Sequence, residues 1–382
     1  MYRLTSARAL LLFLVATLLS LPACTGSKPP VTCLGTCVAQ RFVFASAAGE
    51  VSSYPVNASG TLGAPSTALG TAVTSFKIAA APTSNYLYQT DVLSRSVLAY
   101  SIDLRTGALT AVKGSPYLLG NSSLGAVGIA ITPTFSALYV SDFNGSIAGF
   151  SINGSTGELT PLAHSPFAAG DFAHDLAIDT IGKFLYASGP VGSVLGYTIN
   201  TDGSLSAVPS SPYLVVPLNA APEGVALDPS GKFLYVSLAG TGKIAAFSID
   251  RSTGAFAPIA GSPFPAGNKP EAIGVTPGHF LYAVNAADNT ISGYKVSTVD
   301  GSLAALAGSP FPTGTAVDSN LLAPFSGSVA PDRAGSFLWI GAPQSASLAS
   351  FSINSSTGAL MPLGVTTLPA PLVPGQVSVA YH

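Results

Sequence analysis

Charged side chains are scarce in this 382-residue chain: Asp, Glu, Lys and Arg make up 8% of it, against about a quarter of an average soluble protein. The 15 basic and 17 acidic residues give a formal net charge of −2, and no basic run or basic helix occurs. This argues against nucleic acid and anionic lipid headgroups as partners. The chain has instead 40 glycines and 30 prolines, a composition that favours short strands and turns over helices.

Several catalytic signatures are also absent. No serine lies in a Gly-x-Ser-x-Gly elbow, and there is no phosphate-binding P-loop, dinucleotide fingerprint or His-Glu-x-x-His motif. Serine-hydrolase, nucleotide and zinc-protease chemistry therefore has no support in the sequence. His164 and His279 lie in connecting loops and His382 at the end, so we expect them to be incidental.

One long apolar run occurs, from Ala9 to Leu19, and it follows Arg3 and Arg8. The run is too short to span a bilayer and no second one follows, which predicts an export signal over residues 1–23. "LPAC" at 21–24 looks like the lipobox of bacterial lipoproteins, in which the cysteine, here Cys24, carries the lipid. The alternative is an ordinary cleaved signal with a coincidental cysteine. Because Thr25 stands where an inner-membrane protein would have Asp, we expect an outer-membrane anchor in the cell envelope.

Residues 24–40 are polar and Pro-containing at their start, as in a flexible tether. The two cysteines left after lipidation, Cys33 and Cys37, would lie in an oxidising compartment and predict a local disulfide. A zinc site would need two further ligands, and no nearby His or Cys pair supplies them.

Three marks recur along the rest of the chain at spacings of 44 to 57 residues. The first is an apolar strand ending in an aromatic residue: Phe44, Tyr88, Tyr139, Tyr186, Tyr235, Tyr282 and Trp339. The second is a hairpin signal whose glycines are Gly60, Gly107, Gly157, Gly203, Gly254, Gly301 and Gly358. The third is a Ser-Pro-aromatic loop, missing from the first and last units: Ser115, Ser165, Ser211, Ser262 and Ser309.

These marks predict four antiparallel strands per unit. "YVSLAGTGKIAAFSID" is two alternating runs around a Gly-rich turn, and "SIDRSTGAFAPI" adds a third strand across a tight loop. Another short apolar run precedes each aromatic strand, as in "EGVALDPSG". Such a unit at this period is typical of a β-propeller blade. The alternative is a β-solenoid, whose repeats are usually shorter and need not close.

The two ends of the repeat region complement each other. "RFVFAS" (41–46) is the second strand of a blade with no inner strand before it, and "GQVSVAYH" (375–382) is an inner strand with nothing after it. We therefore predict an all-β fold: a seven-bladed propeller of four-stranded antiparallel blades, closed by the C-terminal strand, with 41–382 as one domain.

In a propeller the starts of the inner strands and the loops between second and third strands meet on one face, which we call the mouth. Alignment of the inner strands gives these first positions: Phe76, Val127, His174, Glu223, Glu271, Phe325 and Gly375. The ends of the second strands and neighbouring residues add a predicted ligand-binding rim: Asp91, Arg95, Asp142, Asp175, Lys269 and Asn285. In so charge-poor a chain this concentration of ionisable groups is the best candidate site.

Three interpretations of the mouth stay open. His174 with Glu223 or Glu271 forms a general acid/base pair that activates water against an ester or lactone carbonyl. Alternatively, Asp142, Glu223 and Glu271 bind a divalent cation, although we expect no metal or other cofactor. The third interpretation is that hydrophilic residues merely line a wet channel.

The stretch "PEGVALDPSGKFLYVSLAGTGKIAAFSIDRSTGAF" (222–256) resembles the seven-bladed lactonase family, which contains 6-phosphogluconolactonase-like and muconate-cyclase-like propellers. The resemblance covers essentially all of 41–382 and rests on blade-scaffold motifs. It implies that a His opening an inner strand serves the lactone with acidic and Arg partners. Here "AHDLAIDTIGKFLY" puts His174 at that position, with Glu223 or Glu271 as the acid. Arg95 is the one arginine near the mouth, whereas a phosphorylated lactone would need several cations.

Two functions from different classes follow. The first is an exported hydrolase of a lactone or ester. The second is a non-catalytic, surface-anchored scaffold that binds a glycan, a peptide or an envelope protein. We expect a monomer whose only contact with the membrane is the N-terminal lipid.

Overall fold

The computed structural model describes residues 41–47, 50–66, 69–70, 75–82, 84–169, 172–189, 192–215, 217–317, 328–368 and 378–381. All of them lie in the unit Ala39–His382. The predicted signal, Cys24, Cys33, Cys37 and the ring positions Phe325 and Gly375 fall outside the described residues. None of the helices in the described ranges is long and apolar enough to cross a membrane.

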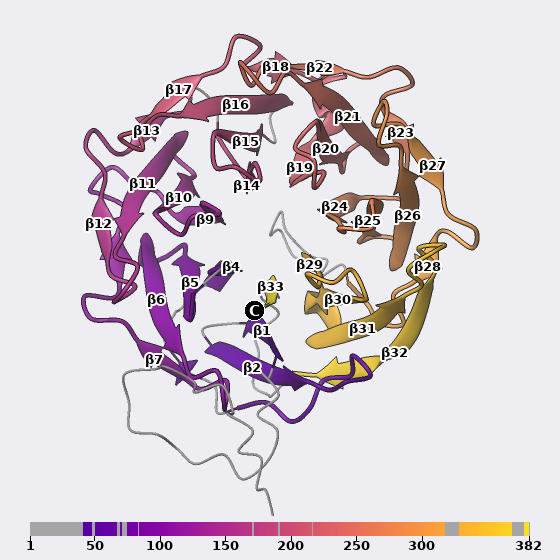
Figure 1. Ribbon diagram of the computed structural model, residues 1–382, viewed down its shortest axis with the longest axis horizontal. Helices are drawn as coiled ribbons and strands as arrows, with labels where there is room; N and C mark the ends of the chain where they lie inside the picture. Colours follow the sequence, from indigo (N-terminus) through magenta and orange to yellow (C-terminus); the bar gives the residue numbers. More distant parts are fainter. Residues whose placement is uncertain are drawn as a thin grey trace, which may run out of the picture. The chain divides into compact units, whose positions relative to one another are not determined.

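The described strands form seven antiparallel sheets that follow one another in chain order around a central axis (Figure 1). The first blade consists of β1 (Arg41–Ala47), β2 (Glu50–Val56), β3 (Leu69–Gly70) and β33 (Ser378–Tyr381). The second consists of β4 (Ser75–Ala80), β5 (Tyr86–Asp91), β6 (Ser96–Ile102), β7 (Leu109–Ala111) and β8 (Tyr117–Leu118). The third consists of β9 (Ala126–Ile131), β10 (Ala137–Asp142), β11 (Ser146–Ile152), β12 (Leu159–Pro161) and β13 (Phe167–Ala168).

The remaining four blades repeat this order. The fourth consists of β14 (Leu176–Ile178), β15 (Phe184–Gly189), β16 (Ser193–Ile199), β17 (Leu205–Ala207) and β18 (Tyr213–Leu214). The fifth consists of β19 (Pro222–Leu227), β20 (Phe233–Leu238), β21 (Lys243–Ile249), β22 (Phe256–Pro258) and β23 (Phe264–Pro265). The sixth consists of β24 (Pro270–Val275), β25 (Phe280–Asn285), β26 (Thr290–Val296), β27 (Leu303–Ala305) and β28 (Phe311–Pro312). The seventh consists of β29 (Ser328–Pro331), β30 (Phe337–Ala342), β31 (Ser347–Ile353) and β32 (Leu360–Thr367). Two short 3-10 turns, η1 (Leu218–Ala220) and η2 (Pro343–Ser345), lie in connections.

The prediction of an all-β propeller is confirmed. Strands from the two ends of the repeat region share one sheet, because β33 pairs antiparallel with β1 in the register Val43–Tyr381 to Ser46–Ser378. The Ser-Pro-aromatic segments were predicted to be loops only, and this is wrong. In five blades the segment contains a two-residue strand that pairs with the third strand, since the serine hydroxyl accepts a hydrogen bond from that strand's backbone, as in Ser165 Oγ with Gly149 N (2.9 Å).

The recurring aromatic residues and the hairpin glycines contact each other between neighbouring blades. The aromatic residue of one blade's second strand donates its phenol proton to the carbonyl of the hairpin glycine in the next blade, as from Tyr139 to Gly203 (2.8 Å). We call this set of contacts the outer seam, and it has four further members: Tyr88–Gly157, Tyr186–Gly254, Tyr235–Gly301 and Tyr282–Gly358. The glycine is required there twice over. Gly254 has φ +75°, and a Cβ on it would lie 2.4 Å from the ring of Phe184.

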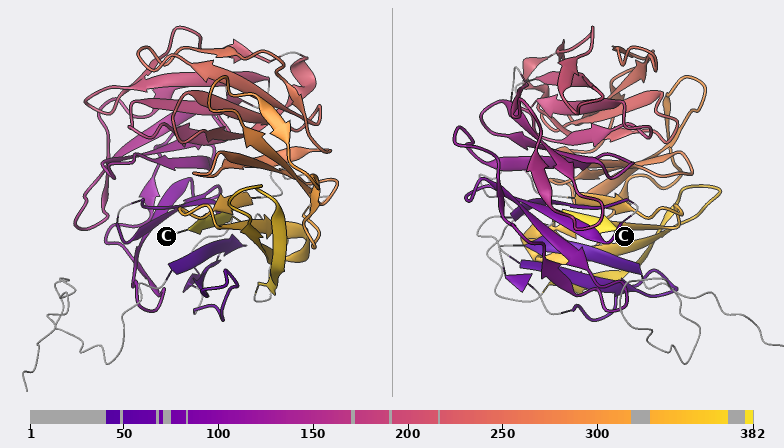
Figure 2. Two further views of the ribbon diagram at one scale, coloured as in Figure 1. Left: turned by 45° about the vertical axis from the view of Figure 1, so that its right-hand side comes forward. Right: turned by 60° about the vertical axis from the view of Figure 1, so that its left-hand side comes forward.

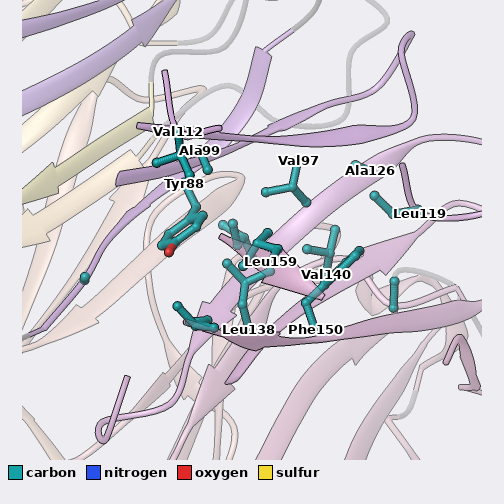
Figure 3. Packing of buried hydrophobic residues seen from close by; sticks show 14 of the residues in the cluster. Tyr88, Val97, Ala99, Val112, Leu119, Ala126, Leu138, Val140, Phe150 and Leu159 are labelled. Atoms are coloured by element: carbon teal, nitrogen blue, oxygen red, sulfur yellow. The ribbon is translucent and has the colours of Figure 1, made fainter. Parts of the chain in front are cut away.

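The hydrophobic core lies between adjacent sheets, which stand side by side around the ring (Figures 1 and 2). One such layer joins Tyr88 and Val97 of the second blade to Leu138, Val140 and Phe150 of the third, all less than 3% exposed (Figure 3). Each blade therefore depends on both neighbours to bury its faces, which is why the same bland unit recurs.

Candidate functional site

The candidate site begins where the inner strands meet the second strands. In several blades the antiparallel register shifts at this point, between Val140 and Asp142, between Pro222 and Val225, and between Pro270 and Ala272. A bulge of this kind redirects side chains away from the regular pleat and is common beside active sites. Val127, Glu223 and Glu271 each lie within such an irregularity, so these three predicted ring positions coincide with bulges.

The backbone of four of the ring residues is held by a hydroxyl from the preceding blade. Ser237 Oγ accepts a hydrogen bond from Gly224 N (2.8 Å) and donates one to the carbonyl of Glu271 (2.9 Å). We call this arrangement a hydroxyl latch. The other latches run from Thr90 to Val127, from Ser141 to His174 and from Ser188 to Glu223. The sequence shows the latch as a Ser or Thr two residues after the aromatic mark, a signal that the sequence analysis missed.

His174 and Glu223 form the centre of the site. Nδ1 of His174 lies 2.9 Å from Oε2 of Glu223, so the imidazole and the carboxyl group are in direct contact. Both residues come from first positions of neighbouring blades, and both are buried, at 3% and 7% exposure. The predicted pairing of His174 with a glutamate is therefore present in the structure.

Two lysines lie near this pair, and each forms an ion pair with a carboxylate. Lys77 Nζ lies 2.5 Å from Asp175 Oδ1, and Lys269 Nζ lies 3.1 Å from Glu271 Oε1. Lys77 thus reaches from the second blade to the fourth. In the third blade a Cβ at Gly128 would lie 2.4 Å from the carbonyl oxygen of His174, so only glycine fits against the backbone of the central histidine.

Burial shifts the pKa of both central groups so that each favours its neutral form. Burial, and secondarily the charge of Lys77, lower the pKa of His174 well below its usual value of 6.5. Burial, followed by the neighbouring Glu271 carboxylate, raises the pKa of Glu223 from 4.5 to about 9. At neutral pH the pair therefore holds a neutral imidazole beside a protonated carboxyl group, which suits a base and an acid in one site.

The other predicted rim residues divide into two groups. Asp142 and Asn285 cap the mouth loops: Asp142 Oδ1 accepts hydrogen bonds from the amides of Leu124 and Asn144, and Asn285 Oδ1 accepts one from Gly267. Asp91 holds the amide of Leu93 in the same way. Asp175 and Lys269, by contrast, lie beside the central pair, and Arg95 is exposed in the turn after β5.

The cation site considered for Asp142, Glu223 and Glu271 is not formed by the described residues. In this part of the chain no group of three or more His, Cys, Asp or Glu side chains is arranged to hold a metal ion. The reason is local, since Asp142 Oδ1 is occupied by backbone amides of its own blade.

The sequence analysis missed Lys77 and the aromatic wall of the site. The ring of Phe76 meets that of His174 edge to face, with centroids 6.1 Å apart, and Phe172 contacts His174 at the same distance. Phe143 stacks on Phe172 at 4.9 Å. Lys77 was visible in principle, because it follows Phe76 just as Asp175 follows His174, with opposite charge at the same register.

Comparison with solved structures places the fold. The periplasmic gluconolactonase of Pseudomonas aeruginosa superposes with a TM-score of 0.73 at 16% identity, over 90% of this chain and 99% of that one. A protein from Lactobacillus plantarum gives a TM-score of 0.68 at 19% identity, over 90% and 99% of the two chains. At these identities the similarity establishes the architecture.

Comparison of sequences identifies the family. A curated relative, the 6-phosphogluconolactonase of Serratia proteamaculans, is 28% identical over 145 residues, which are 36% of this chain and 42% of that protein. The chain thus matches less than half the length of this relative. The family description "Lactonase, 7-bladed beta-propeller" matches residues 39–208 and 191–320. Since these matches span most of the chain and agree with the blade motifs, the chain belongs to the seven-bladed β-propeller lactonase family.

Proposed function

We propose that this protein hydrolyses a lactone at the cluster of His174, Glu223 and Glu271. The observation that carries the proposal is the 2.9 Å contact between His174 Nδ1 and Glu223 Oε2 in a buried setting. Such a setting holds the histidine neutral and the carboxyl protonated, as a base and an acid must be held before the reaction. Membership of the lactonase family supports the choice of a cyclic ester as substrate.

Hydrolysis would proceed through attack by water and successive proton transfers. The imidazole of His174 takes a proton from water as the water oxygen attacks the lactone carbonyl carbon. When the tetrahedral intermediate collapses, the ring C–O bond breaks and the leaving alkoxide takes the proton of the Glu223 carboxyl. The imidazolium then returns a proton to Glu223 through the 2.9 Å contact, and a hydroxy acid leaves. Glu271 is a positioning residue here, because its charge helps to keep Glu223 protonated.

The test is hydrolysis of a panel of uncharged and acidic lactones by the full chain, followed by base titration of the acid released. His174→Ala and Glu223→Gln are each expected to lower kcat by about 10² to 10⁴, the usual contribution of a general acid or base. His164→Asn is the matched control, because His164 is exposed in a left-handed turn, at φ 63°, that Asn also adopts. Absence of turnover with every lactone, or full activity of His174→Ala, would overturn the proposal.

A non-catalytic scaffold is the second candidate, and one observation favours it. His174, Glu223 and Glu271 are only 3%, 7% and 5% exposed, so they present little surface to a ligand. A scaffold would bind its glycan, peptide or envelope protein equally well after His174→Ala and would lose it when several rim residues are changed together. The same variants therefore separate the two functions.

We also propose that the chain is an exported, monomeric lipoprotein, anchored through Cys24 in the outer membrane. Its support is the signal-like segment 1–23 and the periplasmic location named for the P. aeruginosa gluconolactonase. In the same proposal β33 closes a ring of seven blades by completing the sheet of β1, which their pairing supports. Incorporation of labelled palmitate into the wild type and not into Cys24→Ser is the expected result; equal labelling would contradict the anchor.

A further inference from the structure

The proposed acid/base pair lies against an apolar wall. Phe76, Phe143 and Phe172 form a continuous set of ring contacts, with centroid distances of 6.3 Å from Phe76 to Phe143 and 4.9 Å from Phe143 to Phe172. Phe76 and Phe172 both contact the ring of His174. Phe143 and Phe172 are partly exposed, so this wall leads from the buried imidazole toward the solvent.

The wall continues outward onto the rim. Val92, in the turn after β5, packs with Phe76, Phe143 and Phe172 in one cluster. Gly125 closes against the same cluster, since a Cβ on it would lie 2.8 Å from Val92 and 3.0 Å from Phe143. The residues next to these two, Leu93 and Leu124, are 63% and 61% exposed. Two exposed aliphatic residues therefore directly adjoin the cluster along the chain, at the edge of the mouth.

The charges near this wall are paired within the protein. Lys77 and Lys269, the two cations beside the acid/base pair, lie 2.5 Å and 3.1 Å from the carboxylates of Asp175 and Glu271. Arg95 is exposed two residues after Leu93. A phosphorylated sugar would need several cations converging on its phosphate, and the described residues around the wall do not provide such a group.

From this arrangement we infer that the substrate is an uncharged lactone carrying an apolar substituent, which lies against Phe143 and Phe172 and extends toward Leu93 and Leu124. The inference rests on the proposed lactonase function and names its substrate class. The ester ring then lies at His174 and Glu223, and the substituent follows the aromatic wall to the rim. Burial of methylene groups on this surface supplies binding energy that a bare lactone ring lacks.

The test compares lactones with the same ring and different substituents. γ-Butyrolactone and γ-octalactone share a five-membered ring, and glucono-δ-lactone and its 6-phosphate share a six-membered one. The full chain is expected to open γ-octalactone with a kcat/KM at least about tenfold above that of γ-butyrolactone, because the four-carbon chain buries several methylenes. Phosphorylation of the gluconolactone is expected to lower kcat/KM.

Two variants test the location of the substituent. Phe143→Ala is expected to bring the octalactone/butyrolactone ratio close to one. Leu124→Asn, at a side chain that is 61% exposed, is expected to lower the same ratio about fourfold, the value of roughly one methylene. Val299→Ala is the control: Val299 is 90% exposed in the connection between β26 and β27 of the sixth blade, which contributes no residue to the wall, and the change should leave the ratio unchanged.

The outcomes are distinguishable. Turnover of no lactone at all contradicts the proposed function itself. Turnover with equal kcat/KM for the short and long lactones, or with the phosphorylated lactone as the best substrate, overturns only the inference about the substituent. A ratio that survives Phe143→Ala and Leu124→Asn also overturns it.

Discussion

The outer seam and the inner ring of this propeller solve the same packing problem in different ways. At the outer seam the same side chain, a tyrosine, donates to a hairpin carbonyl in five successive blade contacts. At the inner ring the hydroxyl latches hold the backbone carbonyls of Val127, His174, Glu223 and Glu271, whose side chains are of three chemical kinds: aliphatic, imidazole and carboxyl. A contact made to the backbone does not depend on the identity of the side chain. Ring residues can therefore be replaced by reactive ones without loss of the contact that holds the blade.

The largest expected effect comes from blocking a latch at the ring. A Cβ at Gly224 would lie 2.5 Å from the carbonyl oxygen of Glu271, which is backbone and cannot rotate away. Gly224→Ala should therefore lower the free energy of unfolding by about 1–3 kcal/mol, the usual cost of overpacking. Chemical denaturation measures it, with Gly154→Ala as the control, since nothing lies within 4 Å of a Cβ there.

A substitution at the outer seam provides the stability loss with which that of Gly224→Ala is compared. Tyr235→Phe in the same blade removes one buried hydrogen bond, of 2.7 Å to Gly301, and should cost about 1 kcal/mol. If Gly224→Ala proved no more harmful than Gly154→Ala, the close contact between the inner strands would not contribute to stability.

The inner ring also differs from the outer seam in the pH dependence of its contribution to stability. The folded protein keeps the Glu223 proton up to about pH 9, whereas the unfolded chain releases it near 4.5. Between these values the folded state binds more protons, so stability falls as the pH rises, by at most about 1.4 kcal/mol per pH unit. The lowered pKa of His174 acts in the opposite direction only below 6.5, where the unfolded chain gains the proton.

The window from pH 7 to 9 therefore isolates Glu223. Glu223→Gln mimics the protonated carboxyl at every pH and should flatten the decline that the wild type shows there. Thermal or urea unfolding at half-unit pH steps measures both curves. Parallel curves for the two proteins would mean that Glu223 ionises normally in the fold.

The sequence was sufficient for the architecture because the propeller depends on repetition. The aromatic residues and the hairpin glycines predicted the sheets, and the structure shows why they recur together: in five pairs of neighbouring blades the tyrosine hydroxyl donates to the glycine carbonyl. The same alignment brought out His174, Glu223 and Glu271, since equal positions in a repeat occupy equal places in a ring. That part of the site needed only the register of the inner strands.

The remainder of the site depends on distances that alignment does not contain. Lys77 reaches Asp175 across an intervening blade, a contact between residues almost a hundred positions apart in the chain. Asp142 aligned with the rim, yet its carboxylate accepts hydrogen bonds from its own loop. Whether an acid turns toward the axis or toward its own backbone is decided by the bulge geometry, and the pattern of residue types does not encode it.

The hydroxyl latch has a consequence for how such proteins diversify. Ser141, Ser188 and Ser237 bind only main-chain atoms of His174, Glu223 and Glu271. The side chains at these three positions can therefore be exchanged without loss of the hydrogen bond. A new specificity can then arise by single amino-acid substitutions at these ring positions, with no insertion, deletion or loop redesign. For protein engineering, this makes the inner ring the economical place to install a new reactive group in this scaffold.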